Sequence, residues 1–313
     1  MEKFKNIINK LLYYIKGYCR VYYPKCLLTI NLENIQKSIH DFDESAMYDR
    51  LNYYNKVSSR FTLNQQDRIG DVDSSPSAYF LDIMQYARFF PQEYKIAYLF
   101  GDITDVPSLP SIVKSRPVDK NINSVLINMN KIRHFRFVKN DIKFRDKKNK
   151  LVWRGAVYRS NRVQFMENFF NKSDLIDVGD FSGGRSCYPQ WHVPFMSMRE
   201  QLQNKFIVSI EGNDVATNTK WIMSSNSLCF MTKPKYETWF MEGRLIPNYH
   251  YVLLDENYSN LEKELEYYIN NSAAAEAIVA NAHKYIEQFQ DEKSEDWLHF
   301  KVLEKYFKLS GQI

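Results

Sequence analysis

The chain has 313 residues, of which 44% are hydrophobic and 25% are charged, values close to those of globular proteins. Gly and Pro, at 10 residues each, are too few for a collagen-like or linker-dominated chain, and 15% aromatic residues exclude a disordered one. The net charge of +5 comes from one end: six of the 42 basic and one of the 37 acidic residues lie in residues 1–30, so the remainder is neutral. We therefore expect a basic N-terminal segment and no nucleic-acid partner.

The first predicted element is an amphipathic helix over residues 4–15. Its apolar side chains recur at helical spacing and share one face: Phe4, Ile7, Ile8, Leu11, Leu12 and Ile15. Most of the lysines fall off that face. Two interpretations fit this pattern, a helix on an anionic membrane surface formed by residues 1–16 and a helix packed on the protein body.

Apolar and polar patterns then predict a loop, a helix and two strands, over 60–78, 79–90, 95–100 and 124–129. Residues 139–150 hold six Lys or Arg and two Asp, and we place a domain boundary at the end of this basic stretch. Beyond it the pattern alternates regularly. Strands are expected over 151–153, 175–178, 206–210, 228–231 and 249–254, and helices over 161–170, 196–204, 214–225 and 236–243. Residues 259–309 are expected to be helical, with a break near 290–294.

Strands that alternate with helices indicate parallel sheets covered on both faces. The predicted fold class is therefore α/β, with two lobes and a helical C-terminal tail. The four cysteines show no C-x-x-C pair and the six histidines no metal-ligand spacing, so neither a disulfide framework nor a metal site is predicted. No apolar run reaches the span of about 18 residues that crosses a membrane, and charges interrupt any signal-peptide core. We expect a soluble, cytosolic protein.

Three predicted strand ends carry polar residues, and ligands of open α/β sheets bind beyond such ends. The first end holds Asp102 and Asp105, the second holds Arg154, Gly155, Arg159 and Arg162, and the third holds Glu211, Gly212, Asn213 and Asp214. A carboxylate there could be a general base or a turn residue, and the arginines could hold a diphosphate or lie on a solvated surface. Asp214 also fits a helix cap. Residues alone leave three classes open: a nucleotide-sugar transferase, another phosphate-ligand enzyme, and a non-enzymatic binding protein.

Several stretches together resemble glycosyltransferase family 90, which contains bacterial lipopolysaccharide-core transferases, fungal capsule xylosyltransferases and animal protein O-glucosyltransferases. The matching stretches are Leu151–Gly155 with Arg162, Lys205–Ala216, Lys220–Ser227, Trp239–Leu245 with Pro247, and His250–Val252. Phe100–Asp102 with Lys114–Pro117 resembles the bacterial branch. The resemblance covers residues 79–286 and rests on the order of these pieces.

The resemblance implies a GT-B fold, with two Rossmann-like lobes and a cleft between them. It implies an inverting transferase that uses a nucleotide diphosphate sugar without a required metal or other cofactor. The implied organisation is a basic segment at 1–30, an acceptor-side lobe at 31–150, a nucleotide-sugar lobe at 151–285 and a C-terminal helix at 286–313. By position, the implied catalytic base is Asp102, with Asp105 as the alternative.

The resemblance also implies a donor site. Arg162 matches an arginine that contacts the donor diphosphate, and Ala156 and Asn218 stand where animal members have a serine and a second arginine. Lys220 is a substitute for that second charge. The implied donor-site residues are Arg154, Gly155, Ala156, Arg162, Gly212, Asn213, Asp214, Val215, Ala216, Thr217, Asn218 and Lys220. Lys114 and Arg116 are expected either to contact a phosphate or to pair with Asp102 or Asp105.

The expected function is transfer of a hexose from a UDP-sugar to a lipopolysaccharide core or related surface glycan. The absence of a disulfide framework favours the bacterial branch, at the cytoplasmic face of the inner membrane. A capsule- or protein-directed transferase and a non-catalytic nucleotide or glycan binder are the alternatives, the last because of Ala156 and Asn218. Sugar, acceptor, linkage and oligomeric state do not follow from the sequence.

Overall fold

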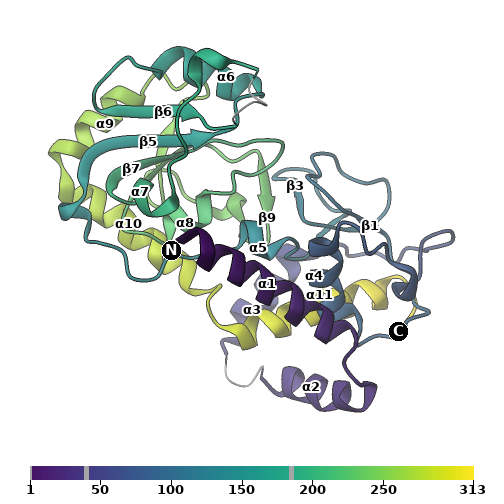
Figure 1. Ribbon diagram of the computed structural model, residues 1–313. Helices are drawn as coiled ribbons and strands as arrows, with labels where there is room; N and C mark the ends of the chain where they lie inside the picture. Colours follow the sequence, from purple (N-terminus) through teal and green to yellow (C-terminus); the bar gives the residue numbers. More distant parts are fainter. Residues whose placement is uncertain (1, 39–41, 183–186) are drawn as a thin grey trace. The chain divides into compact units, whose positions relative to one another are not determined.

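The computed structural model of the chain is a mixed α/β protein with parallel sheets, which confirms the predicted class (Figure 1). It describes residues 2–38, 42–182 and 187–313. Within those ranges no helix is both long enough and apolar enough to cross a membrane.

The chain divides into two compact units. Unit 1 is formed by Met1–Phe135, Tyr236–Met241 and Phe289–Ile313, and unit 2 is formed by Arg136–Lys235 and Glu242–Gln288. The C-terminal residues therefore belong to the same unit as the N-terminal ones, because the last helix packs among the helices of unit 1.

Unit 2 is built on a five-stranded parallel sheet in the order β10-β8-β7-β5-β6. The strands are β5 (Lys148–Gly155), β6 (Ile176–Asp180), β7 (Asn204–Ser209), β8 (Leu228–Thr232) and β10 (Val252–Leu254). In chain order this is the doubly wound arrangement 2-1-3-4-5. The order reverses between β5 and β7, so the crevice beyond the carboxyl ends of these two strands is the place where such a sheet binds ligands.

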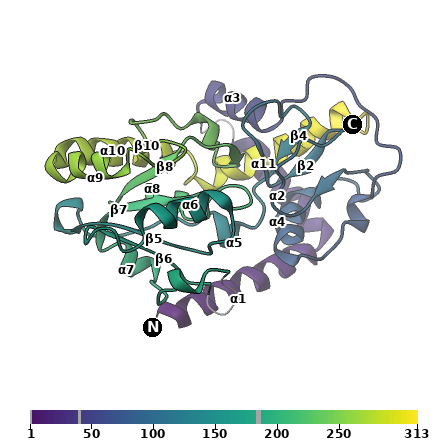
Figure 2. The ribbon, with the colours of Figure 1, turned by 90° about the horizontal axis from the view of Figure 1, so that it is seen from above.

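The centres of β5, β7 and β8 are apolar runs that are buried on both faces, as parallel central strands require. All six residues of β7 are buried, and Leu151, Val152 and Trp153 of β5 are buried as well. The helices in the described part of unit 2 are α6 (Ser160–Phe169), α7 (Met198–Gln201), α8 (Thr219–Met223), α9 (Leu261–Asn270) and α10 (Ser272–Glu287). Of these, α6 contacts β6, α7 contacts β7, and α8 and α10 contact β8, which encloses the core of the unit (Figure 2).

Unit 1 contains a three-stranded parallel sheet in the order β1-β2-β4 and an antiparallel pair, β3 with β9. These strands are β1 (Tyr98–Leu99), β2 (Ser111–Val113), β3 (Ser115–Pro117), β4 (Ser124–Leu126) and β9 (Tyr236–Thr238). Its helices are α1 (Glu2–Val21), α2 (Lys25–Lys37), α3 (Glu44–Tyr54), α4 (Ser77–Ala87), α5 (Lys131–His134) and α11 (Glu292–Leu309). Helix α11 starts at a capping residue, Asp291, whose carboxylate accepts from the Ser294 backbone N–H at 2.7 Å, and it contacts α2, α3 and α4.

Short 3-10 turns complete the two units at Ile69–Asp71, Phe144–Asp146, Pro189–Trp191 and Glu242–Arg244. The first lies in the predicted polar loop over 60–78. The helix predicted over 79–90 and the strands predicted over 124–129, 151–153, 175–178, 206–210, 228–231 and 249–254 are confirmed with shifted ends.

Two sequence-based predictions were wrong in this region. The helix expected over 214–225 with Asp214 as its cap is shorter: α8 begins at Thr219, and Asn218 holds the N-cap position. Residues 212–215 instead form bends, in which the Gly212 N–H donates to the Asp214 carbonyl at 3.0 Å. The helix expected over 236–243 is strand β9, because Glu237 pairs in register with Arg116 of β3.

The remaining differences concern element length. The strand expected over 95–100 is confined to Tyr98–Leu99. The helical region expected over 259–309 has a second break at Asn271, between α9 and α10, besides the break before α11.

Candidate functional site

Arg162 of α6 lies where the loops after β5 and β7 meet in unit 2. Its guanidinium donates from Nη1 to the Ala156 carbonyl at 3.0 Å, from Nη2 to the Ile210 carbonyl at 2.8 Å and from Nε to the Glu211 carbonyl at 3.1 Å. These carbonyls follow the two strands between which the sheet order reverses. The arginine predicted for the donor diphosphate therefore lies at the crevice where a doubly wound sheet binds its ligand.

A second set of polar contacts joins the same two loops. Asn213 accepts through Oδ1 from Nε of Arg159 at 2.8 Å and also from Arg159 Nη2. Asn161 donates from Nδ2 to the Glu211 carbonyl at 3.1 Å. Arg159, Asn161 and Arg162, at the start of α6, thus donate to residues after β7, and these contacts hold the two loops in one arrangement.

Two glycines lie where neighbouring side chains approach the backbone closely. A Cβ added to Gly212 would lie 3.1 Å from Nη2 of Arg162, and one added to Gly155 would lie 2.3 Å from the Trp153 ring. A Cβ at Gly212 would press on the end of the Arg162 side chain, which would have to shift by a few tenths of an ångström, and one at Gly155 would collide with the Trp153 ring. The sequence places glycine where the loops must come together.

The segment from Asp214 to Asn218 continues from this point toward α8. Asp214, Val215 and Ala216 are buried, whereas Thr217 and Asn218 are half-buried. Asn218 donates from Nδ2 to the Val208 carbonyl of β7 at 2.9 Å. The polar side chain at this position is therefore used within unit 2.

Lys220 forms a buried ion pair within unit 2. Its Nζ lies 2.5 Å from Oε1 of Glu242, and the two side chains are 1% and 2% exposed. The positive charge expected to meet the donor is thus matched by a carboxylate of the adjacent 3-10 turn. Lys220 is a structural ion-pair partner in this arrangement.

Arg154 is another predicted donor-site residue whose side chain has a partner within unit 2. Its Nη2 lies 2.7 Å from Oδ1 of Asp177 on β6, and its Nη1 donates to the Asp177 carbonyl at 2.9 Å. Strand residues alternate in direction, so Arg154 is drawn to the neighbouring strand and not toward Arg162.

An open cavity of about 870 Å³ lies next to the first turn of α6. Its lining is mainly polar or aromatic and includes Tyr158, Ser160, Asn161, Gln164, Tyr188, Lys235, Glu256 and Asn257. Because Asn161 also touches the loop after β7, the cavity adjoins the crevice at Arg162. A space of this size accommodates a nucleotide-sized ligand.

In unit 1, Asp102 lies beyond the carboxyl ends of β1 and β2. It follows Gly101, whose φ of +114° is open to glycine alone among common residues, and its Oδ1 forms an ion pair with Nζ of Lys114. The Lys114 side chain is 2% exposed and that of Asp102 is 24% exposed. A buried ammonium thus holds a partly accessible carboxylate in place.

Asp105 has a different setting. It is exposed, and its described contact is with the neighbouring Thr104 hydroxyl at 3.5 Å. Lys114 pairs with Asp102, as one alternative predicted. Arg116 does not: it is fully buried, and its Nε lies 2.7 Å from Oε1 of Glu237 on β9. Arg116 therefore stabilises the core of unit 1, and its predicted contact with a phosphate was wrong.

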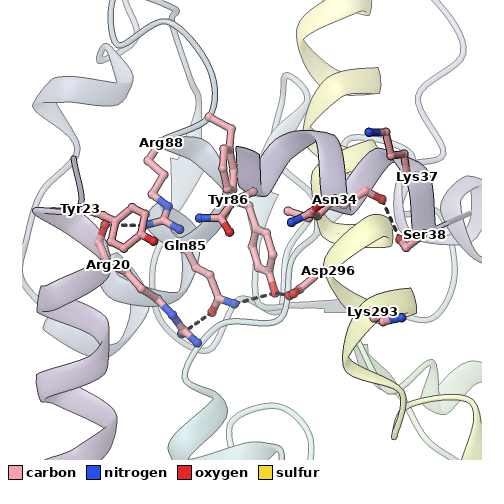
Figure 3. Close-up of a pocket in the computed structure, with 13 residues that line it drawn as sticks. Arg20, Tyr23, Asn34, Lys37, Ser38, Gln85, Tyr86, Arg88, Lys293 and Asp296 are labelled. Carbon is pink, nitrogen blue, oxygen red and sulfur yellow. Dashed lines mark hydrogen bonds between the residues drawn. The ribbon is translucent and has the colours of Figure 1, made fainter. Parts of the chain in front are cut away.

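A second cavity, of about 780 Å³, lies within unit 1 between α1, α2, α4 and α11 (Figure 3). Four cationic side chains and one carboxylate line it: Arg20, Lys37, Arg88, Lys293 and Asp296. A chain of hydrogen bonds runs from Arg20 through Gln85 and Tyr86 to Asp296, which closes at 2.6 Å. Burial is the main cause that lowers the pKa of Arg88, and the positive charge of Arg20 is the second cause. No residue predicted for the site lines this cavity.

Sequence reasoning missed the partners of the site residues. Arg159 was singled out for its charge, but its link to Asn213 joins positions 54 residues apart, and no local pattern signals it. The same holds for Glu242, the partner of Lys220. Asn161 carried the one available signal, since a polar side chain in the first turn of a helix commonly satisfies nearby backbone groups.

Comparison with known proteins adds the family. The model of the family described as Glycosyl transferase family 90 matches residues 114–311. A curated relative from Dichelobacter nodosus, named O-glucosyltransferase LpsA, is 43% identical over 268 residues, which cover 85% of this chain and 84% of the relative. The family match spans β3 to α11 and so includes the whole crevice around Arg162. The chain belongs to glycosyltransferase family 90.

Proposed function

We propose that this glycosyltransferase moves a glucosyl group from UDP-glucose, with inversion, to a lipopolysaccharide core or related surface glycan. The observation that carries the proposal is that Arg162 contacts the loops after both β5 and β7, at the ligand-binding edge of the sheet. The match to the family of glycosyl transferases supports it. The relative is named an O-glucosyltransferase, which supports glucose over other hexoses. We further propose the GT-B fold, with unit 2 as its donor lobe.

The donor side is supported by charge and by the helix start. A UDP leaving group carries two phosphates, and positive groups must stabilise its developing charge. Arg162 and Arg159 lie in the first turns of α6 and at its N-cap, where the macrodipole is positive. We propose that these groups neutralise the diphosphate, with no metal required.

Asp102 is the proposed base. It accepts the proton of the acceptor hydroxyl as that oxygen attacks the anomeric carbon. The new C–O bond forms while the bond from the anomeric carbon to the diphosphate oxygen breaks, and its electron pair leaves with UDP. Attack from the opposite side inverts the anomeric configuration. The Lys114 contact is proposed to position the carboxylate for this step.

The proposed location is the cytoplasmic face of the bacterial inner membrane, where a lipid-linked acceptor would be met. The printed name of the relative, LpsA, and its high identity support a lipopolysaccharide acceptor. Capsule- and protein-directed transfer are the competing assignments, and a panel of acceptors separates them.

The test is a transfer assay with radiolabelled UDP-glucose and a panel of lipopolysaccharide-core, capsule and peptide acceptors. We expect product with the core acceptor and a fall in kcat of about 10²–10⁴-fold in Asp102→Asn. The Asn oxygen can still accept a hydrogen bond from Lys114, and the Tm of the variant verifies its folding. Asp105→Asn is the matched control and retains turnover.

Three results would contradict the proposal. Full activity in Asp102→Asn would exclude it as the base, and loss only in Asp105→Asn would transfer that role. Nucleotide binding without transfer to any acceptor would favour the non-catalytic binder.

A further inference from the structure

Helix α1 packs on the body of unit 1 through its polar side. The Tyr13 hydroxyl donates to the Ala78 carbonyl of α4 at 3.1 Å, and Arg20 Nη1 donates to Gln85 Oε1 at 3.1 Å. Between them Gly17 rests on Leu81, so closely that an added Cβ would lie 2.8 Å from Cδ1 of that leucine. Residues 13, 17 and 20 share one helical face, and their contacts turn that face to α4.

The apolar stripe of α1 lies on a different side and is exposed. Ile7 and Leu11 are each 58% exposed and Ile15 is 49% exposed, and Ile8, Leu12 and Tyr18 are exposed as well. Amphipathic helices of globular proteins normally turn this stripe to the core. Here the arrangement is reversed, and the packed-on-the-body interpretation holds only for the polar side of the helix.

Such a stripe is unusual on a protein surface. Scattered exposed leucines are ordinary, but six large apolar side chains on one helix form a contiguous patch of the kind that marks an interaction site. The patch ends at Tyr18 and Tyr22, and tyrosine is favoured where an apolar phase meets water.

The charges beside the stripe have one sign. Residues 7–21 contain Lys10, Lys16 and Arg20 and no Asp or Glu. At 100° per residue, Lys10 and Lys16 fall on opposite borders of the stripe, and both are exposed. Long cationic side chains at these borders can reach outward to phosphate while the apolar stems lie against the stripe.

We propose that α1 docks on an anionic lipid bilayer, with Ile7, Leu11 and Ile15 buried at the boundary of headgroups and acyl chains. The helix would lie in the plane of the surface. Charge decides between a bilayer and a second copy of this chain: two α1 helices would bring like charges together, whereas anionic lipids complement them. The proposal goes beyond glycosyl transfer, because docking needs neither donor nor acceptor.

The experiment is flotation of the full chain with two kinds of vesicle at physiological salt, pure phosphatidylcholine and phosphatidylcholine with about 30 mol % phosphatidylglycerol. We expect flotation with the anionic vesicles alone and release at high salt. Ile7→Ser/Leu11→Ser/Ile15→Ser is expected to lower the partition coefficient by about 100-fold or more, since each residue loses its burial. Lys10→Gln/Lys16→Gln is expected to lower it by about tenfold or more.

Matched controls use residues outside α1. Ile122→Ser/Ile246→Ser removes exposed apolar residues, and Lys139→Gln/Lys172→Gln removes exposed lysines. Both are expected to float like the wild type. All of the positions are exposed, so unchanged circular dichroism and Tm are expected and verify folding.

Three outcomes would overturn the proposal. One is wild-type chain that does not float with anionic vesicles. Another is equal flotation of the triple serine variant and the wild type. The third is a concentration-dependent dimer in sedimentation that the triple variant abolishes, without vesicle binding, because the stripe would then be covered by a second copy. Each leaves the transfer assay unaffected, so the two proposals fail separately.

Discussion

The buried pair of Lys220 and Glu242 distinguishes a structural charge from a donor-binding one. Lys220→Met removes the ammonium that lies 2.5 Å from the Glu242 carboxylate, whose side chain is 2% exposed. Breaking such a pair from one side costs about 3–5 kcal/mol, because a buried charge loses its compensation. At about 2–4 °C per kcal/mol for a chain or unit of 150–250 residues, the melting temperature should fall by roughly 10 °C.

The assay is thermal and urea unfolding of three variants followed by circular dichroism. Lys220→Met and Glu242→Leu should each destabilise strongly. The double variant should regain much of the loss, because well-packed apolar side chains of similar size replace a buried pair at little cost. The double-variant cycle therefore gives an interaction free energy of a few kcal/mol, about 3 kcal/mol or more.

A specific result would refute this reasoning. If the free energy of unfolding of Lys220→Met lies within about 0.5 kcal/mol of the wild-type value, as is usual for surface substitutions, then Lys220 is not a buried structural charge. If the same variant also loses UDP affinity by about tenfold or more, Lys220 is a donor ligand and replaces the missing second arginine.

Three further outcomes follow from the structure. Arg162→Lys keeps the charge but loses the planar guanidinium that donates to three carbonyls, so calorimetry should show UDP binding weakened by about tenfold or more. In the control Arg145→Lys, where the exposed arginine pairs with Glu276, UDP should bind as tightly as in the wild type. Transfer from UDP-glucose should stay within about twofold after dialysis against EDTA, and a larger loss that Mg²⁺ or Mn²⁺ restores would contradict a metal-independent donor site. Burial is the main cause that holds the pKa of His299 well below its usual range, and the positive charge of Lys131 is the second cause. The unfolded chain therefore binds the extra proton, and stability should fall as the pH drops below about 6.5, by up to about 1.4 kcal/mol per pH unit relative to His299→Gln in urea titrations; equal slopes would refute this.

The sheet of unit 2 could be predicted because its signal is local. The centres of β5 and β7 are the buried runs Leu-Val-Trp and Phe-Ile-Val, and polar residues with glycine follow each run. Alternation with helices then indicates a parallel sheet. The position of Arg162 near Glu211 follows from the sheet order, which a sequence without the structure does not specify.

Elements set by distant partners could not be predicted. Strand β9 was expected to be a helix, yet Glu237 pairs with Arg116, which lies 121 residues earlier. Helix α8 was expected to begin at Asp214, but the residues after Gly212 are bent and not helical, so the helix begins at Thr219. The tertiary contact overrides the local propensity in both cases.

The apolar face of α1 illustrates a third limit. Its periodicity predicted the helix correctly over residues 4–15. Periodicity cannot say which face meets the body, and here Tyr13 and Gly17 do so. Helices α2 and α3 were missed, since neither shows a strong apolar period.

The most direct test of the donor site is a calorimetric titration of UDP into the wild type and into Gly212→Val, both in EDTA. A valine side chain would crowd Arg162, because the Cβ alone would lie 3.1 Å from its Nη2. Gly70→Ala is the control, where an added Cβ meets Gln92 at an ordinary 3.6 Å. We expect one UDP per chain in the wild type and the control, and binding weakened by about tenfold or more in Gly212→Val. Equal binding of UDP by all three proteins would place the donor site away from Gly212 and contradict the account. The account would also be contradicted if the wild type bound no UDP.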